Sequence, residues 1–307
     1  MPQLLHFIAP QPLKPGSVVA IVAPASPFER EELFRGLAWL RTRYRLKLTG
    51  GILTRTGYTA GDDPRRAAEL AAAMVDPEVE AILCARGGYG AMRLLDDLPW
   101  SAFAERPKWL AGFSDVTALH AMANARGICT LHAPNVTGLG RSITPSERAA
   151  LLDGLEGRPC AAWSGLEIMH RSSAGSHAPS RLHARGPFIG GNLALLVGMA
   201  AANRLVVPQG AVLAIEDVTE RPYRIDRMLT ALRLGGHLAP ASAIVFGGFT
   251  QCEAGADGVT AEHVLHERTG DLGIPVVAGA PFGHGAPNRT FVLGGTAELD
   301  DTTLRFV

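Results

Sequence analysis

A serine at the end of a predicted buried strand is the first residue whose position suggests chemistry. Residues 109–113 predict a strand, Ser114 follows at once, and residues 116–125 predict a helix. A hydroxyl at such a turn is lifted out of the sheet, beside the amides that open the helix. This strand–turn–helix arrangement is typical of a nucleophile elbow, although the sequence is not Gly-x-Ser-x-Gly. Capping of the helix by Ser114 is the structural alternative.

A serine hydroxyl is a poor nucleophile unless a base takes its proton, and the chain offers ten histidines. His284 stands between Gly283 and Gly285 after a predicted strand, so a backbone bend can present its ring in a cleft. A solvent-exposed turn is the alternative for this histidine. His132 also follows a strand and competes for the role of base, whereas we expect His120 to pack on its helix.

A carboxylate that could orient the base stands where the strand over residues 212–215 stops. In α/β layers, functional groups commonly follow the carboxyl ends of strands, and Glu216 occupies that position. The alternative is a structural ion pair between Glu216 and Arg224 or Arg227.

A glycine-rich segment, Arg86-Gly87-Gly88-Tyr89-Gly90, lies between a predicted strand and a helix. Its glycines permit close approach of the backbone and expose amides to an oxyanion. A dinucleotide site is poorly supported, because the segment is not Gly-x-Gly-x-x-Gly and does not follow the first strand. The sequence also lacks a Walker lysine motif and a His-Glu-x-x-His motif.

Apolar strands alternate with helical patterns in the first half, which predicts an α/β fold with a parallel sheet covered on both faces. The predicted strands are residues 18–22, 79–84, 109–113 and 128–131, and the predicted helices include residues 29–44 and 62–75. The stretch over residues 157–187 is polar. We therefore divide the chain into an amino-terminal domain (1–160), a crossing (161–187) and a carboxy-terminal domain (188–307).

The second half predicts strands at residues 212–215, 242–249 and 274–278, with helices after Asn192 and over residues 224–234. The last residues predict an antiparallel finish with turns at Gly294-Gly295 and Asp300-Asp301.

Composition narrows the function classes. The 307 residues carry 29 basic and 29 acidic side chains, and 47% are apolar. A zero net charge argues against general binding to nucleic acid or anionic lipid, and the apolar content excludes a disordered chain. Four dispersed cysteines favour reduced thiols over a zinc site. No apolar run is long enough for a membrane span, and the amino end does not read as a secretory signal, so we expect a cytoplasmic protein.

Five blocks together resemble the LD-carboxypeptidases, serine peptidases of murein-peptide recycling that include the microcin C self-immunity peptidases. The blocks are Arg-Gly-Gly-Tyr-Gly-Ala from residue 86, Gly-Phe-Ser-Asp-Val-Thr from 112, Gly-Gly-Asn-Leu from 190, Ile-Glu-Asp from 215 and Phe-Gly-His-Gly from 282. They occur in the family's order and spacing, and the similarity covers nearly the whole chain.

The resemblance implies a role for each site residue. Ser114 is then the nucleophile, His284 the general base and acid, and Glu216 the carboxylate that holds the imidazole. Backbone amides near Gly87 or Gly88 and at Asp115 form the oxyanion hole. The implied architecture is a flavodoxin-like amino-terminal domain followed by a smaller, β-rich α/β domain. A homodimer, a cytoplasmic location and the absence of a metal or cofactor are also implied.

A carboxypeptidase must hold the terminal carboxylate of its substrate, a task that suits arginine. We nominate Arg86, with Arg224 and Arg227 as rivals and structural ion pairs as the alternative. Asn192 and Tyr89 are further candidates for the substrate pocket; helix capping and core packing are their respective alternatives.

The expected reaction is hydrolysis of the amide bond to the terminal D-alanine of a murein tetrapeptide. A microcin-type peptidyl-nucleotide is the second substrate within the family. A non-catalytic peptide-binding protein on the same scaffold and a broad esterase are the alternatives from other classes.

Overall fold

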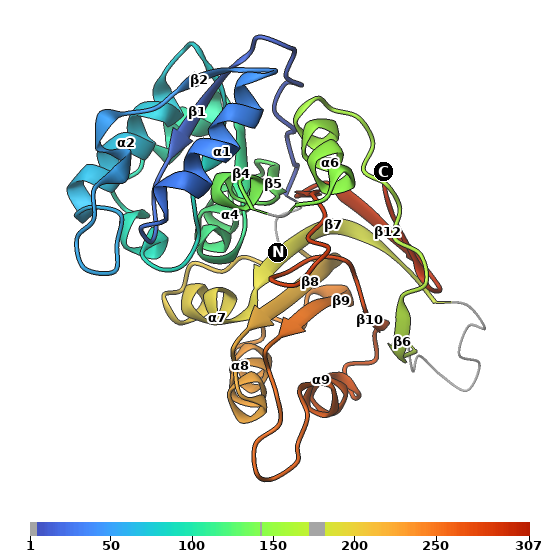
Figure 1. Ribbon diagram of the computed structural model, residues 1–307. Coiled ribbons are helices and arrows are strands. Elements are labelled where there is room, and N and C mark those ends of the chain that lie inside the picture. Colours follow the sequence, from blue (N-terminus) through green and yellow to red (C-terminus); the bar gives the residue numbers. More distant parts are fainter. Residues whose placement is uncertain (1–4, 142, 172–181) are drawn as a thin grey trace. The chain divides into compact units, whose positions relative to one another are not determined.

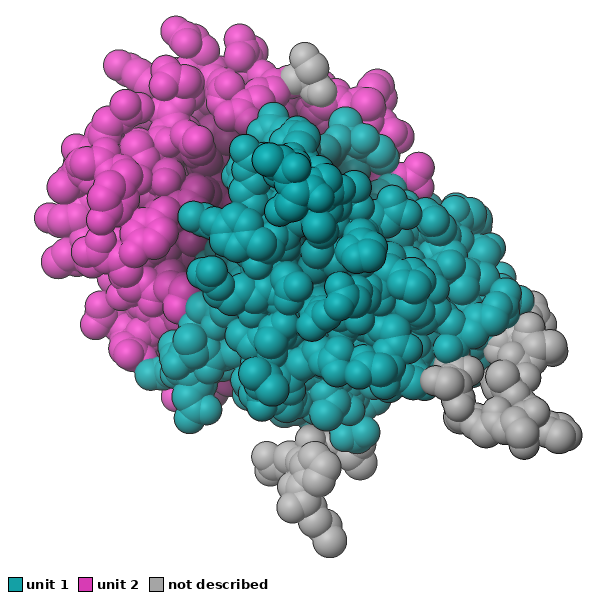
Figure 2. Space-filling view, turned by 90° about the horizontal axis from the view of Figure 1, so that it is seen from below, with its two compact units in different colours: residues 1–6, 161–288, 294–307 teal, residues 7–160, 289–293 magenta. Residues whose placement is uncertain are grey.

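The computed structural model describes residues 5–141, 143–171 and 182–307, and the chain forms two compact units (Figure 2). The amino-terminal unit, magenta in Figure 2, comprises residues 7–160 and 289–293. The carboxy-terminal unit, teal in the same view, comprises residues 161–288 and 294–307, with residues 5 and 6. Each unit therefore takes a short segment from the far end of the chain.

A six-stranded sheet in the order β11-β5-β4-β3-β1-β2 forms the centre of the amino-terminal unit (Figure 1). β1 to β5 run parallel, and β11 pairs with β5 in the antiparallel sense. The strands are β1 (Val18–Val22), β2 (Arg45–Lys47), β3 (Val79–Cys84), β4 (Trp109–Gly112), β5 (Thr130–His132) and β11 (Phe291–Leu293). The helices are α1 (Arg30–Arg41), α2 (Asp63–Val75), α3 (Trp100–Glu105), α4 (Thr117–Asn124), α5 (Val136–Leu139) and α6 (Pro145–Leu155). Short 3₁₀ turns are η1 (Gly50–Leu53), η2 (Ala91–Leu94) and η3 (Ser114–Val116).

Local sequence explains the first two helices of this unit. Leu33, Leu37 and Leu40 of α1 are buried on one stripe, as their spacing predicts, and Tyr44 just beyond the helix is buried with them. α2 begins after Asp62, whose carboxylate accepts a hydrogen bond from the backbone N–H of Arg65 at 2.9 Å. Asp62 is thus the N-cap of α2, at the first residue of the predicted helix.

A seven-stranded sheet in the order β13-β12-β7-β8-β9-β10-β6 forms the carboxy-terminal unit. β7 to β10 run parallel, whereas β6, β12 and β13 pair antiparallel with their neighbours. The strands are β6 (Glu167–His170), β7 (His183–Asn192), β8 (Ala211–Val218), β9 (Ala241–Thr250), β10 (Val276–Ala278), β12 (Thr296–Asp300) and β13 (Thr303–Phe306). α7 (Leu193–Ala201) packs beside α8 (Pro222–Leu234), and α8 beside α9 (Ala261–Thr269), as Figure 1 shows. The α/β fold class, with a mostly parallel amino-terminal sheet and a second, β-rich part, is confirmed.

Two stretches differ in detail from the expectation. Gly294-Gly295 is not a hairpin turn, because β11 before it and β12 after it belong to different sheets. The turn after Asp300 does join the antiparallel pair of β12 and β13, as predicted. The polar stretch assigned to the crossing, residues 161–187, contributes β6 and the start of β7 to the second sheet. Residues 172–181 of that stretch lie outside the described residues.

Within the described parts of the chain, no helix combines the length and apolar character needed to cross a membrane.

Candidate active site

Ser114 lies at the sharp turn between β4 and α4, and its backbone adopts a φ of +65°. This left-handed conformation is uncommon for a residue with a side chain and costs about 1 kcal/mol or more. Ser114 is the first residue of η3, and the N-cap positions of η3 and α4 are held by Phe113 and Val116. A strained serine between a buried strand and a helix is the geometry expected of a nucleophile elbow.

The glycine-rich segment approaches this serine closely at Gly87. A Cβ atom added at residue 87 would lie 2.7 Å from Ser114 Cβ and 3.0 Å from Ser114 Oγ. Only a glycine allows the backbone to come so near to the hydroxyl. Among the described residues, the amides of Gly87 and Gly88 donate to no protein acceptor, as donors for an oxyanion require.

Asp115, the residue after the serine, is buried, and its Oδ2 accepts a hydrogen bond from the backbone N–H of Ala91 at 2.7 Å. Burial raises the pKa of Asp115 to about 6, since desolvation disfavours the charged carboxylate. The side chain of this residue was not predicted to have a role, because only its amide belonged to the expected oxyanion hole.

The carboxy-terminal unit brings together the predicted base, His284, and the carboxylate predicted to orient it, Glu216. His284 Nδ1 donates to Glu216 Oε2 over 2.7 Å, and the Glu216 side chain on β8 is 0% exposed. A proton held on Nδ1 leaves the lone pair on Nε2, the tautomer that a general base requires. The alternative ion pairs of Glu216 are wrong: Arg224 pairs with Glu220, and Arg227 lies over the ring of Tyr223.

Gly283 and Asn288 hold the loop that carries the imidazole. Gly283 has a φ of +124°, and a Cβ atom there would lie 3.0 Å from Glu216 Oε2. Its backbone N–H donates to Asn288 Oδ1 at 3.1 Å. The glycine before His284 is thus needed for the close passage of the loop over the buried carboxylate. Asn288 carries no sequence signal that points to this contact.

Asp217, next to Glu216 on β8, ties the strand to the start of α7. Its carboxylate accepts hydrogen bonds from Asn192 Nδ2 at 2.9 Å and from the backbone N–H of Ala194 at 3.0 Å. Burial raises the pKa of Asp217 to about 6. Asn192 Oδ1 also accepts from the N–H of Leu195, so this residue does cap the helix, as its alternative interpretation holds.

The predicted substrate-binding arginines and tyrosine have contacts of their own. Arg86 donates to the carbonyl oxygen of Pro27 at 2.6 Å, and Arg224 is exposed beside Glu220. Tyr89 is 53% exposed and meets Tyr58 edge-on, with 5.4 Å between ring centroids. Core packing of Tyr89 is therefore wrong.

His132, the competing candidate for the base, and His120 are both buried in the amino-terminal unit. The ring of His132 stacks on Phe291 with 4.6 Å between centroids. His120 Nε2 lies 3.0 Å from the carbonyl oxygen of Gly112, and burial lowers the pKa of this histidine to about 4. His120 packs as expected, whereas His132 does not occupy a cleft.

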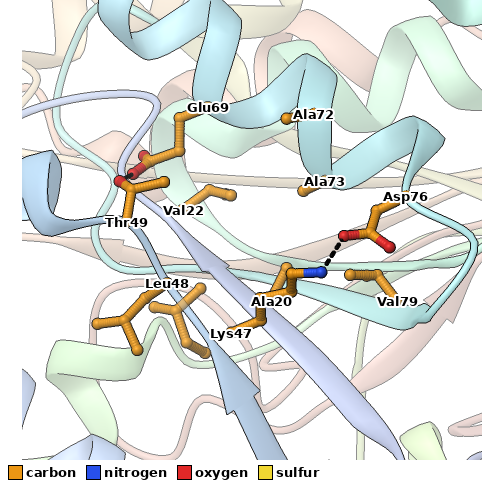
Figure 3. A pocket seen from close by; sticks show the side chains of 11 residues that line it. Ala20, Val22, Lys47, Leu48, Thr49, Glu69, Ala72, Ala73, Asp76 and Val79 are labelled. Carbon is orange, nitrogen blue, oxygen red and sulfur yellow. Dashed lines mark hydrogen bonds and ion pairs between the residues drawn. The ribbon is translucent and has the colours of Figure 1, made fainter.

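The amino-terminal unit holds a cavity of about 160 Å³ (Figure 3). Its lining is mostly apolar, and its polar side chains are paired, Lys47 with Asp76 and Thr49 with Glu69. None of the predicted site residues lines it. Among the described residues, no three His, Cys, Asp or Glu side chains gather in a way that could hold a metal ion.

Comparison with known proteins matches most of the chain to one family. Residues 19–133 match the LD-carboxypeptidase N-terminal domain, and residues 185–299 match the LD-carboxypeptidase C-terminal domain. A Synechocystis sp. protein named as a carboxypeptidase is 40% identical over 300 residues, covering 96% of this chain and 95% of its own. The murein tetrapeptide carboxypeptidase of Pseudomonas aeruginosa is 33% identical over 296 residues, 94% of each chain.

Among solved structures, the muramoyltetrapeptide carboxypeptidase from Oxalobacter formigenes superposes with a TM-score of 0.82 at 26% identity, over 94% of this chain and 97% of that one. These similarities define the class of the protein, a peptidase hydrolase of the carboxypeptidase kind. More narrowly, the chain belongs to the LD-carboxypeptidase family, and the resemblance found in the sequence is confirmed.

Proposed function

We propose that the protein is a serine peptidase that hydrolyses the amide bond to the terminal D-alanine of murein tetrapeptides. The observation that carries the proposal is the hydrogen bond between His284 Nδ1 and the fully buried Glu216 carboxylate. A buried carboxylate on Nδ1 orients the imidazole and stabilises the imidazolium that forms during catalysis. The strained turn at Ser114 and the family relatives named for murein peptides support it further.

In the first half of the reaction, His284 Nε2 takes the proton of Ser114 Oγ while Oγ attacks the carbonyl carbon between an L-centre and D-alanine. The negative charge that develops on the carbonyl oxygen is held by backbone amides of Gly87 or Gly88 and of Asp115. His284 then gives its proton to the amide nitrogen, the C–N bond breaks, and D-alanine leaves.

In the second half, His284 takes a proton from water, and the hydroxide attacks the acyl ester on Ser114. The ester C–O bond breaks, the tripeptide leaves as a carboxylic acid, and Ser114 recovers its proton from His284. No redox step or added group is needed for this sequence.

Recognition of the D-alanine carboxylate is assigned to Arg86, with Arg224 and Arg227 as rivals. Arg86 belongs to the glycine-rich segment next to Gly87, and its contact with Pro27 is to a neutral carbonyl. A guanidinium has five N–H donors, so this contact leaves capacity for a carboxylate. Arg86→Ala should raise KM for the tetrapeptide about tenfold or more, and have little effect on its carboxy-terminal amide. An equal change for both substrates in Arg86→Ala, with a selective change in Arg224→Ala, reassigns the role.

Release of D-alanine from murein tetrapeptide, followed by mass spectrometry, tests the proposed function. Wild type and the control Ser101→Ala, which changes an exposed serine on α3, should release D-alanine at similar rates. Ser114→Ala should release it at least about 10³-fold more slowly. Equal release by Ser114→Ala and wild type would contradict the serine assignment.

Two other functions would give different results in the same assay. Tetrapeptide binding without turnover in the wild type would indicate a peptide-binding protein. Cleavage of a peptidyl-nucleotide in preference to the tetrapeptide would indicate the microcin branch, to which the Escherichia coli microcin C7 self-immunity protein (26% identical over 96% of this chain) belongs. The expected homodimer is tested by light scattering after gel filtration, and the expected cytoplasmic location by cell fractionation.

A further inference from the structure

The peptide group between Gly90 and Ala91, at the end of the glycine-rich segment, is held on both sides by buried charges. Arg66 Nη1 donates to the carbonyl oxygen of Gly90 at 2.9 Å. Asp115 Oδ2 accepts from the N–H of Ala91 at 2.7 Å. The carbonyl end of this one peptide thus faces a cation and its N–H end faces an anion. Both hydrogen bonds are charge-assisted, the strong kind in a protein interior.

Both charged groups are removed from water. The Arg66 side chain is 0% exposed and Asp115 is 2% exposed. Arg66 also donates to the carbonyl oxygen of Pro24 and pairs with Asp63. A buried charge is costly unless its partners are fixed in place, so the strand ends and turns around these two groups have one favourable arrangement.

The held peptide lies a short distance along the chain from the predicted oxyanion donors. Asp115 is the neighbour of Ser114 in sequence, and Gly87 already lies against Ser114. Ser26 makes two hydrogen bonds to the glycine-rich segment. Its N–H donates to the carbonyl oxygen of Gly87 at 3.1 Å, and its Oγ accepts from the N–H of Tyr89 at 3.0 Å. The segment is therefore anchored at several successive peptide groups.

We propose that Arg66 and Asp115 are positioning residues for the reaction: by holding the Gly90–Ala91 peptide, they set the distance between the amides of Gly87 and Gly88 and the hydroxyl of Ser114. The inference rests on the proposed function, because it assumes that these amides stabilise an oxyanion formed at Ser114. It assigns the Asp115 side chain a role separate from that of its amide.

Asp115→Ala removes the acceptor for the Ala91 N–H and should lower kcat for murein tetrapeptide by about 10- to 100-fold, with KM within about threefold of wild type. Asp115→Asn keeps a side-chain oxygen for the same N–H and should recover at least about tenfold of the lost kcat. Glu69→Ala is the matched control, since Glu69 is a buried carboxylate of the same unit that accepts from the N–H of Ala23 at 2.7 Å.

The control separates positioning from loss of stability. Glu69→Ala should lower the melting temperature about as much as Asp115→Ala but leave kcat within about threefold. A folded Asp115→Ala with kcat within about twofold of wild type overturns the proposal, as does an equal loss of kcat in Glu69→Ala. If Asp115→Ala does not fold, Arg66→Lys takes its place. A lysine keeps the charge but lacks the planar fork, whose Nη1 donates to both carbonyls while Nη2 pairs with Asp63, so kcat should fall several-fold, and an unchanged kcat overturns the proposal.

A fluorophosphonate probe makes the result independent of the substrate. The rate at which it labels Ser114 depends on the same oxyanion donors, so it should fall in Asp115→Ala in proportion to kcat. Labelling of Ser114 in a wild type that releases no D-alanine would contradict the proposed substrate, while the change in labelling rate would still test the positioning role.

Discussion

The serine turn of the amino-terminal unit and the acid–base pair of the carboxy-terminal unit are built in different ways. Around Ser114 the geometry comes from the backbone, with a positive φ at the serine and a glycine pressed against it. Around His284 it comes from side chains, with one short hydrogen bond to a buried carboxylate. The first arrangement should be sensitive to added atoms, and the second to lost charge or lost donors.

Removal of the imidazole should have the largest effect. In the proposed mechanism His284→Ala leaves Ser114 without a base, and it leaves Glu216 without its hydrogen-bond donor, so kcat for D-alanine release should fall by about 10⁴-fold or more. Initial rates by mass spectrometry measure this, with His263→Ala on the exposed face of α9 as the control. A loss below about tenfold in a folded His284→Ala would exclude this histidine as the base.

Removal of the negative charge at Glu216 should have the next largest effect. Glu216→Gln keeps the volume but presents a neutral amide to Nδ1, which no longer stabilises the imidazolium, so kcat should fall by about 10³-fold. Glu220→Gln is the matched control. It changes a nearby carboxylate that pairs with Arg224, and it should retain nearly full activity. Similar rates for the two variants would remove the carboxylate from the mechanism.

A side chain added at Gly87, beside Ser114, tests the arrangement that depends on backbone geometry. Gly87→Ala places a Cβ atom 2.7 Å from Ser114 Cβ, so the segment and the turn must separate, and kcat should fall by about 100-fold. Gly50→Ala is the control, because a Cβ atom at residue 50 meets nothing within 4 Å. Full activity of Gly87→Ala would show that the close approach has no part in catalysis.

The smallest effect concerns stability and pH. Burial raises the pKa of Asp217 to about 6 from an ordinary value of 3.8. Between these two values the folded protein binds more protons than the unfolded chain, so its stability falls as the pH rises. From pH 4 to pH 6.5 the wild type should lose about 2 kcal/mol more unfolding free energy than Asp217→Asn, which has no titrating group there. Urea denaturation at the two pH values measures the unfolding free energy of both proteins. An equal change with pH in wild type and Asp217→Asn would refute a raised pKa.

The sequence predicted best the parts that depend on local pattern. The bounds of β1 and β3 agree with the apolar runs at residues 18–22 and 79–84. Helix α6 was not predicted, although Thr144 and Glu147 form a capping box at its start. Its apolar residues make a weak stripe, so the cap was the only strong signal.

The contacts that could not be predicted join residues far apart in the chain. The sequence around Arg66 predicts an ordinary surface arginine of a helix. Its guanidinium is instead buried and donates to the carbonyl oxygens of Pro24 and Gly90. Asn288 supports Gly283 only because the loop between them returns on itself. Such partners depend on tertiary structure, which no local spacing encodes. Their positions after predicted strands made His284 and Glu216 candidates with alternatives left open, and the family resemblance then paired them.

A double-mutant cycle of Ser114 and His284 tests the proposed mechanism most directly. D-alanine release from murein tetrapeptide is measured for Ser114→Ala, for His284→Ala and for the variant with both changes. If the hydroxyl and the imidazole act in one proton transfer, the double variant should be no slower than the slower single variant, within about threefold. Losses that multiply, so that the double variant is slower by the product of the two single effects, would contradict a shared mechanism.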